Sequence, residues 1–185
     1  MSLERMLKEN LIKRQKPDFK QIEKQLNRSE KDIETAKKNL KFDTTWAITI
    51  AYHSMIRAAR ALMFSNGFLP TTKNTHKTIV DFTNLVLGSE PEYNNLINKF
   101  NRLRKQRHNF IYESENGFTE EEAESTLKTA KSLLKKIKDL IKTENPQIEL
   151  FKYKEWRRNV KMWNVECEMW ERHLQFTIFD LRFSI

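Results

Sequence analysis

The stretch DTTWAITIAYHSMIRAARALMFSNGF, residues 43–68, decides the fold of this chain. It opens on Asp43 and Thr44, both of which cap helix N-termini well, and closes at Asn66-Gly67, which suits a left-handed C-terminal cap. It therefore predicts a helix over residues 44–65 at the centre of a helical bundle. Small residues in this helix let neighbouring helices approach closely: Ala47, Ala51, Ser54, Ala58, Ala59 and Ala61.

Helical patterns continue on both sides of this central stretch. Thr119 and Glu122 form a capping box, which begins a helix that ends before Pro146. Only 3 Gly and 4 Pro occur in 185 residues, and this composition favours long helices over sheets. We expect an all-α fold, an up-and-down bundle of four long helices plus one short helix, with GFLPTTKNTH (67–76) as a loop. Apolar residues at helical spacing predict the other helices near residues 3–14, 18–40, 75–87 and 90–113.

The chain after Pro146 differs in character. Large apolar residues recur there with spacings of four and three, which puts them on one stripe of a helix. The stripe predicts either packing against the bundle or an interface with a second copy or another partner. We divide the chain into an N-terminal segment (1–17), a helical bundle (18–145) and a Trp-rich extension (146–185). The stripe consists of Trp156, Val160, Trp163, Cys167, Trp170 and Leu174.

The charge balance points to an anionic partner. The sequence has 34 Lys and Arg against 25 Asp and Glu, a formal net charge of +9. A basic surface attracts nucleic acid, nucleotides or an acidic protein, although solvated lysines alone give the same count. No apolar run approaches the roughly 18 residues that cross a bilayer, and the chain starts without the apolar block of a signal peptide. We expect a soluble, cytoplasmic protein.

The basic segment RLRKQRHNFIYES, residues 102–114, is the strongest candidate for a functional site. Four Lys or Arg residues and one His alternate there with apolar residues of the predicted helix. Three interpretations fit this pattern: a solvated amphipathic surface, an anion- or RNA-binding surface, and a catalytic site. The candidate phosphate-binding residues are Arg102, Arg104, Lys105 and Asn109.

Three segments, in order, resemble the HEPN family, the nucleotide-binding domains of higher eukaryotes and prokaryotes. YHSMIRAARALMFSNG (52–67) resembles the family helix that typically reads Tyr-Tyr-Ala-x-Phe-x-Ala-Ala-Arg-Ala-Leu-Leu and ends in Gly. THKTIVDF (75–82) resembles the His-containing third helix, with His76 and Phe82 in place. The basic segment follows where the family carries a signature Arg, and the resemblance covers residues 19–143.

This resemblance implies a helical bundle, commonly a homodimer, that acts on RNA or binds nucleotide. Many members are metal-independent ribonucleases of toxin–antitoxin and defence systems, and a frequent partner is a small nucleotidyltransferase of the polymerase-beta type. Here Arg107 matches the signature Arg, His108 matches the polar residue after it, and Tyr112 stands where a catalytic His is expected. These three are the candidate catalytic residues. Tyrosine, with an ordinary pKa of about 10, is a poor general base at neutral pH. A non-catalytic binding or scaffolding module is therefore the alternative function.

The residues themselves support phosphate chemistry. RNA cleavage without a metal needs a base for the 2′-hydroxyl, an acid for the leaving oxygen and a cation for the charge on phosphate. His108 supplies one imidazole, Arg104 supplies a cation one helical turn earlier, and a dimer would supply a second imidazole. We expect His53 and His76 to be buried, hydrogen-bonded histidines. No Cys, His and carboxylate spacing indicates a metal site and no Gly-rich loop indicates a nucleotide cradle, so we expect no cofactor.

Overall fold

The structure, a computed structural model, describes residues 1–88, 90–112 and 118–145, and for residues 107–112 it describes the backbone alone. The chain divides into two compact units, Met1–Glu144 and Asn145–Ile185. All the described helices and strands belong to the first unit. The predicted apolar stripe from Trp156 to Leu174 lies outside the described residues, so its role stays a prediction.

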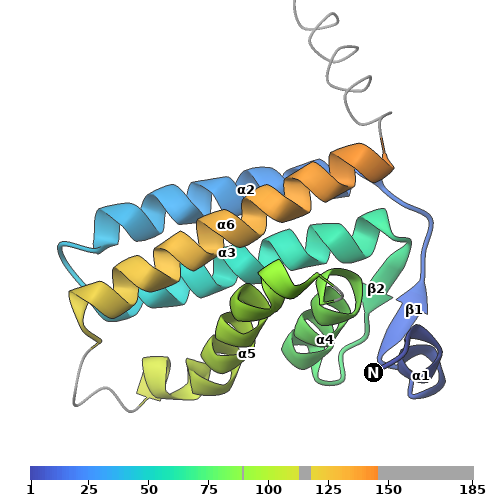
Figure 1. Ribbon diagram of the computed structural model, residues 1–185, viewed down its shortest axis with the longest axis horizontal. Helices are drawn as coiled ribbons and strands as arrows, with labels where there is room; N and C mark the ends of the chain where they lie inside the picture. The colour runs from blue at the N-terminus through green and yellow to red at the C-terminus, as the bar shows by residue number, and fades with distance from the viewer. Residues whose placement is uncertain (89, 113–117, 146–185) are drawn as a thin grey trace, which may run out of the picture. The chain divides into compact units, whose positions relative to one another are not determined.

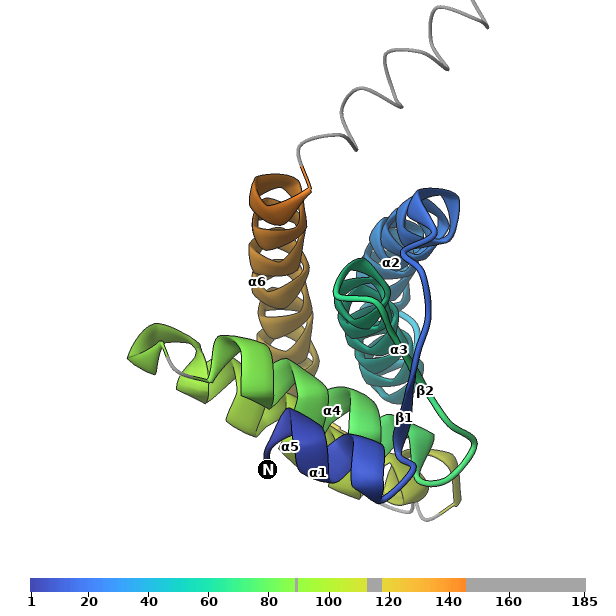
Figure 2. The same cartoon turned by 90° about the vertical axis from the view of Figure 1, so that its right-hand side faces the viewer.

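Helices dominate the described part of the first unit, which also holds one small sheet (Figure 1). Four helices are long, α4 is shorter and α1 has only six residues, so the predicted all-α bundle is confirmed. Figures 1 and 2 show α2, α3 and α6 side by side, with α4 and α5 along one side of them. The helices are α1 (Leu3–Lys8), α2 (Phe19–Asn39), α3 (Thr44–Ser65), α4 (Thr75–Leu87), α5 (Pro91–Tyr112) and α6 (Glu120–Glu144).

The helix α3 is the centre of the bundle, as predicted. Of its 22 residues, 14 are buried, which is more than the single face that an amphipathic surface helix hides. It packs against α2, α4, α5 and α6. Ala58, Ala59 and Ala61 are each 0% exposed, because these small side chains let the neighbouring helices come close to the α3 backbone.

The predicted helix ends are also present. The Asp43 side chain accepts a hydrogen bond from the Trp46 backbone N–H at 2.9 Å, which caps the start of α3. Before α6, the Thr119 N–H donates to Glu122 Oε2 at 3.1 Å and the Glu122 N–H donates to Thr119 Oγ1 at 3.2 Å, which is the predicted capping box. After α3, Gly67 has a φ of +78°, a left-handed conformation that is easy only without a Cβ.

A small antiparallel sheet departs from the sequence prediction. The helical pattern predicted near residues 3–14 ends after α1, where Asn10 takes a left-handed φ of 53°. The chain then forms strand β1 (Ile12–Arg14), which pairs with β2 (Phe68–Pro70). The helix prediction was therefore wrong for β1, and the loop prediction was wrong for β2. Such short strands gain their hydrogen bonds from a partner far away in the sequence, so no local pattern reveals them.

Candidate functional site

The basic segment belongs to the helix α5, and the buried apolar residues of α5 fix how the helix is oriented against the core. Its start follows the usual rules, with Pro91 in the first position and Glu92 in the first turn. Ile97, Phe100 and Leu103 are at most 9% exposed and form the buried face of the helix. The polar residues between them are thereby turned away from the core.

A lysine of α6 holds the beginning of α5. Lys136 Nζ lies 4.2 Å from the centroid of the Tyr93 ring and 3.2 Å from Glu90 Oε2. The pKa of the Lys136 ammonium is raised, chiefly by its hydrogen bond with the Tyr93 side chain and further by Glu90. These contacts tie the first turn of α5 to α6.

The described cations of the basic segment lie on different sides of α5. Arg104 is half-buried, and its Nε donates to Asn101 Oδ1 at 3.0 Å. Arg102 and Lys105 are exposed. Arg102 lines a cavity of about 260 Å³ between α5 and α6, whose wall includes Glu121. Positions two apart on a helix differ by about 200°, so Arg102 and Arg104 do not come together as one clamp.

The remaining predicted site residues belong to the last two turns of α5. Arg107, His108, Asn109 and Tyr112 are in the helix, but their side chains lie outside the described residues. Their backbone continues the helix whose buried face holds Phe100. The roles assigned to these four side chains stay predictions.

A hydrogen-bonded tyrosine–histidine pair lies beside α5. Tyr52 Oη and His76 Nδ1 are 2.8 Å apart, and this contact joins α3 to the first turn of α4. Tyr52 is 2% exposed, and its ring centroid lies 6.1 Å from that of Phe100 on α5. The Tyr52–His76 pair therefore sits where three helices meet, next to the buried face of the basic helix.

A second histidine accompanies the pair. The rings of His53 and His76 meet edge to face with their centroids 6.3 Å apart. His53 is exposed, so the prediction that it is buried was wrong: it follows the buried Tyr52 by about 100° around α3 and reaches the outer surface. His76 has the predicted hydrogen bond but is only half-buried.

Sequence reasoning missed this grouping because its members belong to different helices. Tyr52 and His53 are on α3, whereas His76 is on α4 across a connection that contains β2. A signal was nevertheless available, since two of the three segments that resemble the HEPN family contain these residues. If the helices of those two segments had been expected to pack side by side, the sequence would have predicted that His53 and His76 lie close together.

The pair contains an imidazole, the side chain that most often serves as a general acid or base. An unperturbed imidazole has a pKa of about 6.5, close to physiological pH. Which partner donates in the Tyr52–His76 hydrogen bond depends on the tautomer of His76. The imidazole of His76 thus lies on α4, which packs against α5, the helix that carries the basic segment.

Two further features bear on the site. In the described ranges, no three His, Cys, Asp or Glu side chains are grouped so that they could hold a metal ion. Within the same part of the chain, no helix combines the length and apolar character that crossing a membrane requires.

These observations define a class of protein: a helical bundle whose basic helix adjoins a buried tyrosine that is hydrogen-bonded to a half-buried histidine. Comparison with protein families matches residues 22–140 to the HEPN domain. The match covers more than half of the 185 residues, and the chain belongs to the HEPN domain family. A search of curated proteins found no match. The resemblance seen in the sequence is thus confirmed, and membership indicates a nucleotide- or RNA-related function.

Proposed function

We propose that this HEPN protein binds RNA along α5 and cleaves it without a metal ion, as one half of a cytoplasmic toxin–antitoxin-like pair with a small nucleotidyltransferase. One observation carries the proposal. Cations of the basic segment and the Tyr52–His76 pair occupy adjoining helices, which meet at Phe100. Metal-independent cleavage of an RNA backbone requires positive charge that binds phosphate and side chains that exchange protons.

RNA binding is the first step. Arg102 and Lys105 are exposed and Arg104 is half-exposed, so all three are available to phosphate oxygens. Arg107 and Asn109 belong to the same basic segment and lie about one turn further along α5. Because Arg102 and Arg104 lie on different sides of α5, we expect them to contact the phosphates of different nucleotides.

Cleavage is the second step and needs two proton-exchanging groups. A base takes the 2′-hydroxyl proton, the 2′ oxygen attacks phosphorus, and the bond from phosphorus to the 5′ oxygen breaks. An acid then protonates the 5′ oxygen, which leaves a 2′,3′-cyclic phosphate and a 5′-hydroxyl. We assign these roles to His76 and His108, with Arg107 facing the charge that develops on phosphate. His76 supplies a second imidazole within one chain.

The substitution at Tyr112 favours a second candidate function. Tyrosine stands there where the family resemblance expects a catalytic His, and it is a poor base at neutral pH. A module that binds RNA or nucleotide through α5 without cleaving it, or that serves as a scaffold for the transferase, is therefore the alternative.

The partners in this proposal rest on the family, in which homodimers and pairing with a polymerase-beta-type nucleotidyltransferase are common. A toxin is expected to stop the growth of a bacterial host when it is expressed without its partner. Arg107→Ala should restore growth at an equal protein level. Normal growth with the same amount of wild-type protein would contradict the toxin role.

RNA binding by α5 is tested by the fluorescence anisotropy of a labelled single-stranded RNA at increasing salt. Arg104→Ala/Lys105→Ala is expected to make the negative slope of log affinity against log salt shallower by about 1.4, because each phosphate contact on a single strand contributes about 0.7 to its magnitude. Lys20→Ala/Lys24→Ala removes two exposed charges from α2 and is the control. Equal effects of the two double substitutions would contradict α5 as the binding surface.

A further inference from the structure

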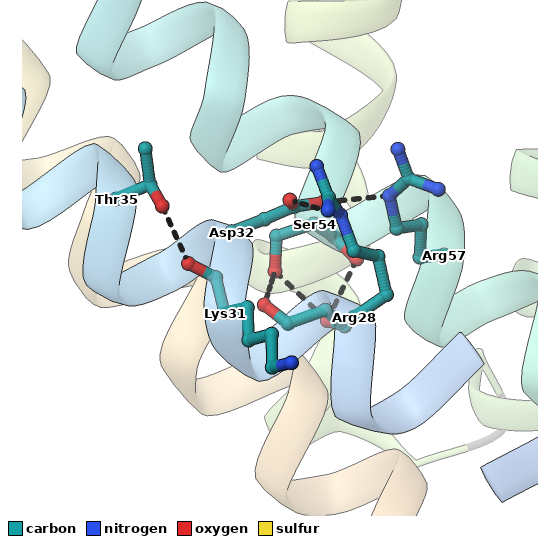
Figure 3. Close-up of polar contacts among 7 residues, drawn as sticks. Arg28, Lys31, Asp32, Thr35, Ser54 and Arg57 are labelled. Carbon is teal, nitrogen blue, oxygen red and sulfur yellow. Dashed lines mark hydrogen bonds and ion pairs between the residues drawn. The ribbon is translucent and has the colours of Figure 1, made fainter. Parts of the chain in front are cut away.

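A buried carboxylate on α2 holds two arginines from different helices (Figure 3). Arg28 Nε donates to Asp32 Oδ1 at 3.0 Å, and Arg57 Nε of α3 donates to Asp32 Oδ2 at 2.6 Å. The Asp32 side chain is 7% exposed, whereas those of Arg28 and Arg57 are 60% and 35% exposed. Each carboxylate oxygen therefore fixes one guanidinium, and both guanidinium groups reach the surface.

The outer ends of this Arg28–Arg57 pair remain hydrogen-bond donors. Both arginines bond Asp32 through Nε, and within the described part of the chain their Nη nitrogens bond no other protein group. Two positive charges against one negative charge leave the cluster with a net charge of +1. Guanidinium groups with outward Nη atoms match the geometry of an oxyanion such as phosphate.

Packing of α2 on α3 keeps the pair in place. Ser29 and Ser54 are each 0% exposed and bond reciprocally: Ser29 Oγ donates to the Ser54 carbonyl oxygen at 2.9 Å, and Ser54 Oγ donates to the Ser29 carbonyl oxygen at 3.0 Å. Ser29 directly follows Arg28, and Ser54 lies one helical turn before Arg57. Donors that are held in position lose little conformational entropy when a ligand binds.

The cluster borders a groove between α2 and α6. Arg28 and Asp32 are among the lining residues of this basic groove, whose volume is about 1070 Å³. The lining comes from α2 and α6 alone and carries seven Lys or Arg against four Asp or Glu, a formal net charge of +3. Lys138 of α6 pairs with Glu30 of α2, and the arginines neutralise Asp32. Most of the charge that remains in the groove is positive.

Lysines line both walls of the groove, two from α2 and four from α6. On α2, the exposed Lys31 and Lys38 lie seven positions apart, which puts them on one side of the helix. On α6, the spacings of four, three and four have the same effect and extend the row over about 16 Å, at about 1.5 Å of rise per residue. This second row consists of Lys131, Lys135, Lys138 and Lys142.

We infer that the basic groove and the Arg28–Arg57 pair bind the phosphate backbone of a nucleic acid strand, on a surface separate from α5. Only Ile33 and Leu134 among the fifteen lining residues are apolar. Nucleic-acid interfaces are much more positively charged than protein–protein interfaces, and the net positive lining of this groove has that character. An extended phosphate backbone is therefore the ligand that the rows of lysines fit. The use of RNA as the probe rests on the proposed function.

Salt-dependent binding of a labelled 20-nucleotide single-stranded RNA to the full-length chain tests the inference. Lys131→Ala/Lys135→Ala should weaken binding and reduce the magnitude of the salt slope by about 1.4, since two phosphate contacts are lost. Lys37→Ala/Lys128→Ala removes two exposed lysines from the same two helices, outside the groove lining, and is the matched control. An unchanged slope in the groove variant, or an equal fall in both variants, would overturn the inference.

The arginine pair is tested at constant charge. Arg57→Lys keeps the ion pair with Asp32 but removes the guanidinium fork, so RNA binding is expected to weaken several-fold with an unchanged melting temperature. Unchanged RNA affinity would overturn the arginine pair as part of the site.

Two further comparisons separate the alternatives. A poly-glutamate peptide that binds as tightly as the RNA, and loses affinity in Lys131→Ala/Lys135→Ala, would identify an acidic peptide as the ligand and overturn the inference. Failure of the proposed function gives a different result, in which Arg104→Ala/Lys105→Ala has no effect while the groove variant still weakens RNA binding.

Discussion

At Asp32, burial and charge oppose each other. A carboxylate taken out of water costs several kcal/mol unless its charge is paired and its oxygens are hydrogen-bonded. Arg28 and Arg57 meet both needs, one at each oxygen. Both arginines remain partly exposed, so the pairing also fixes two guanidinium groups at the edge of the groove.

Replacement of Asp32 by Ala tests this arrangement. We expect the free energy of unfolding to fall by about 1–3 kcal/mol, because two adjacent guanidinium groups lose their counter-ion but stay partly hydrated. Urea denaturation measures the change. Glu34→Ala removes an exposed carboxylate from the same helix and should shift stability by less than about 0.5 kcal/mol. Equal midpoints for the two variants would contradict the role given to Asp32.

Tyr52→Phe isolates the hydroxyl of the Tyr52–His76 pair. The ring stays packed, so we expect a loss of about 0.5–1.5 kcal/mol from the missing hydrogen bond. The nitrogen NMR resonance of His76 Nδ1 should move in this variant. Tyr93→Phe, in the first turn of α5, is the control and should leave that resonance in place. An unchanged chemical shift of His76 Nδ1 in Tyr52→Phe would argue against the pair as an acid–base unit.

At the scale of elements, Gly67 connects the central helix to the sheet. The Gly67 N–H donates a hydrogen bond to the Phe64 carbonyl oxygen at 3.1 Å, and the Gly67 carbonyl oxygen accepts one from the Gln15 N–H at 2.9 Å. A Cβ on Gly67 would lie 3.2 Å from the Gln15 carbonyl oxygen. The left-handed φ therefore coincides with a close backbone approach at the junction of α3 and β2.

Gly67→Ala is accordingly expected to destabilise the protein by about 1–2 kcal/mol, from left-handed strain together with the tight contact. Thermal unfolding followed by circular dichroism measures this as a lower melting temperature. Loss of order in the sheet should accompany it, seen as faster amide exchange in β1. A melting temperature equal to that of the wild type would show that the junction tolerates a Cβ.

Elements whose signals are local were predictable from the sequence. Asp43 and the Thr119–Glu122 capping box fix helix ends through bonds only three residues long, and the apolar spacing fixes the helices between them. The pairing of β1 with β2 spans more than fifty residues and left no such signal. The helical bundle was predictable for this reason, and the sheet was not.

At the scale of the whole molecule, the candidate sites also have parts that could be predicted from local sequence and parts that depend on long-range packing. The i,i+4 spacing of Arg28 and Asp32, like the lysine row of α6, can be read from the sequence. That Arg57 completes the cluster, and that α2 faces the lysine row, follow only from helix packing. The same limit applies to Tyr52 and His76, which meet across two helices.

The excess of basic residues is thus distributed over at least two surfaces. The basic segment of α5 and the basic groove between α2 and α6 are built from different helices. Two separate phosphate-binding surfaces on one chain would hold an RNA strand at two places. We expect RNA affinity to fall steeply with salt, with each surface contributing its own part of the slope.

The oligomeric state is a further prediction at this scale. We expect a homodimer in sedimentation equilibrium, and Trp163→Glu should dissociate it if the apolar stripe forms the interface, because a buried charge is costly there. Lys24→Ala is the surface control and should leave the dimer intact. A dimer that survives Trp163→Glu would remove the stripe as the interface.

Cleavage of a fluorescent single-stranded RNA by the purified full-length chain in EDTA tests the central claim most directly. The account predicts cleavage by the wild type, with a 2′,3′-cyclic phosphate product. His76→Gln, His108→Ala and Arg107→Ala should each slow it by about 100-fold or more, because each removes an acid–base or phosphate-facing group. Lys24→Ala, an exposed substitution on α2, should cleave at the wild-type rate. Wild-type protein that binds the RNA but cleaves no faster than these three variants would contradict the account.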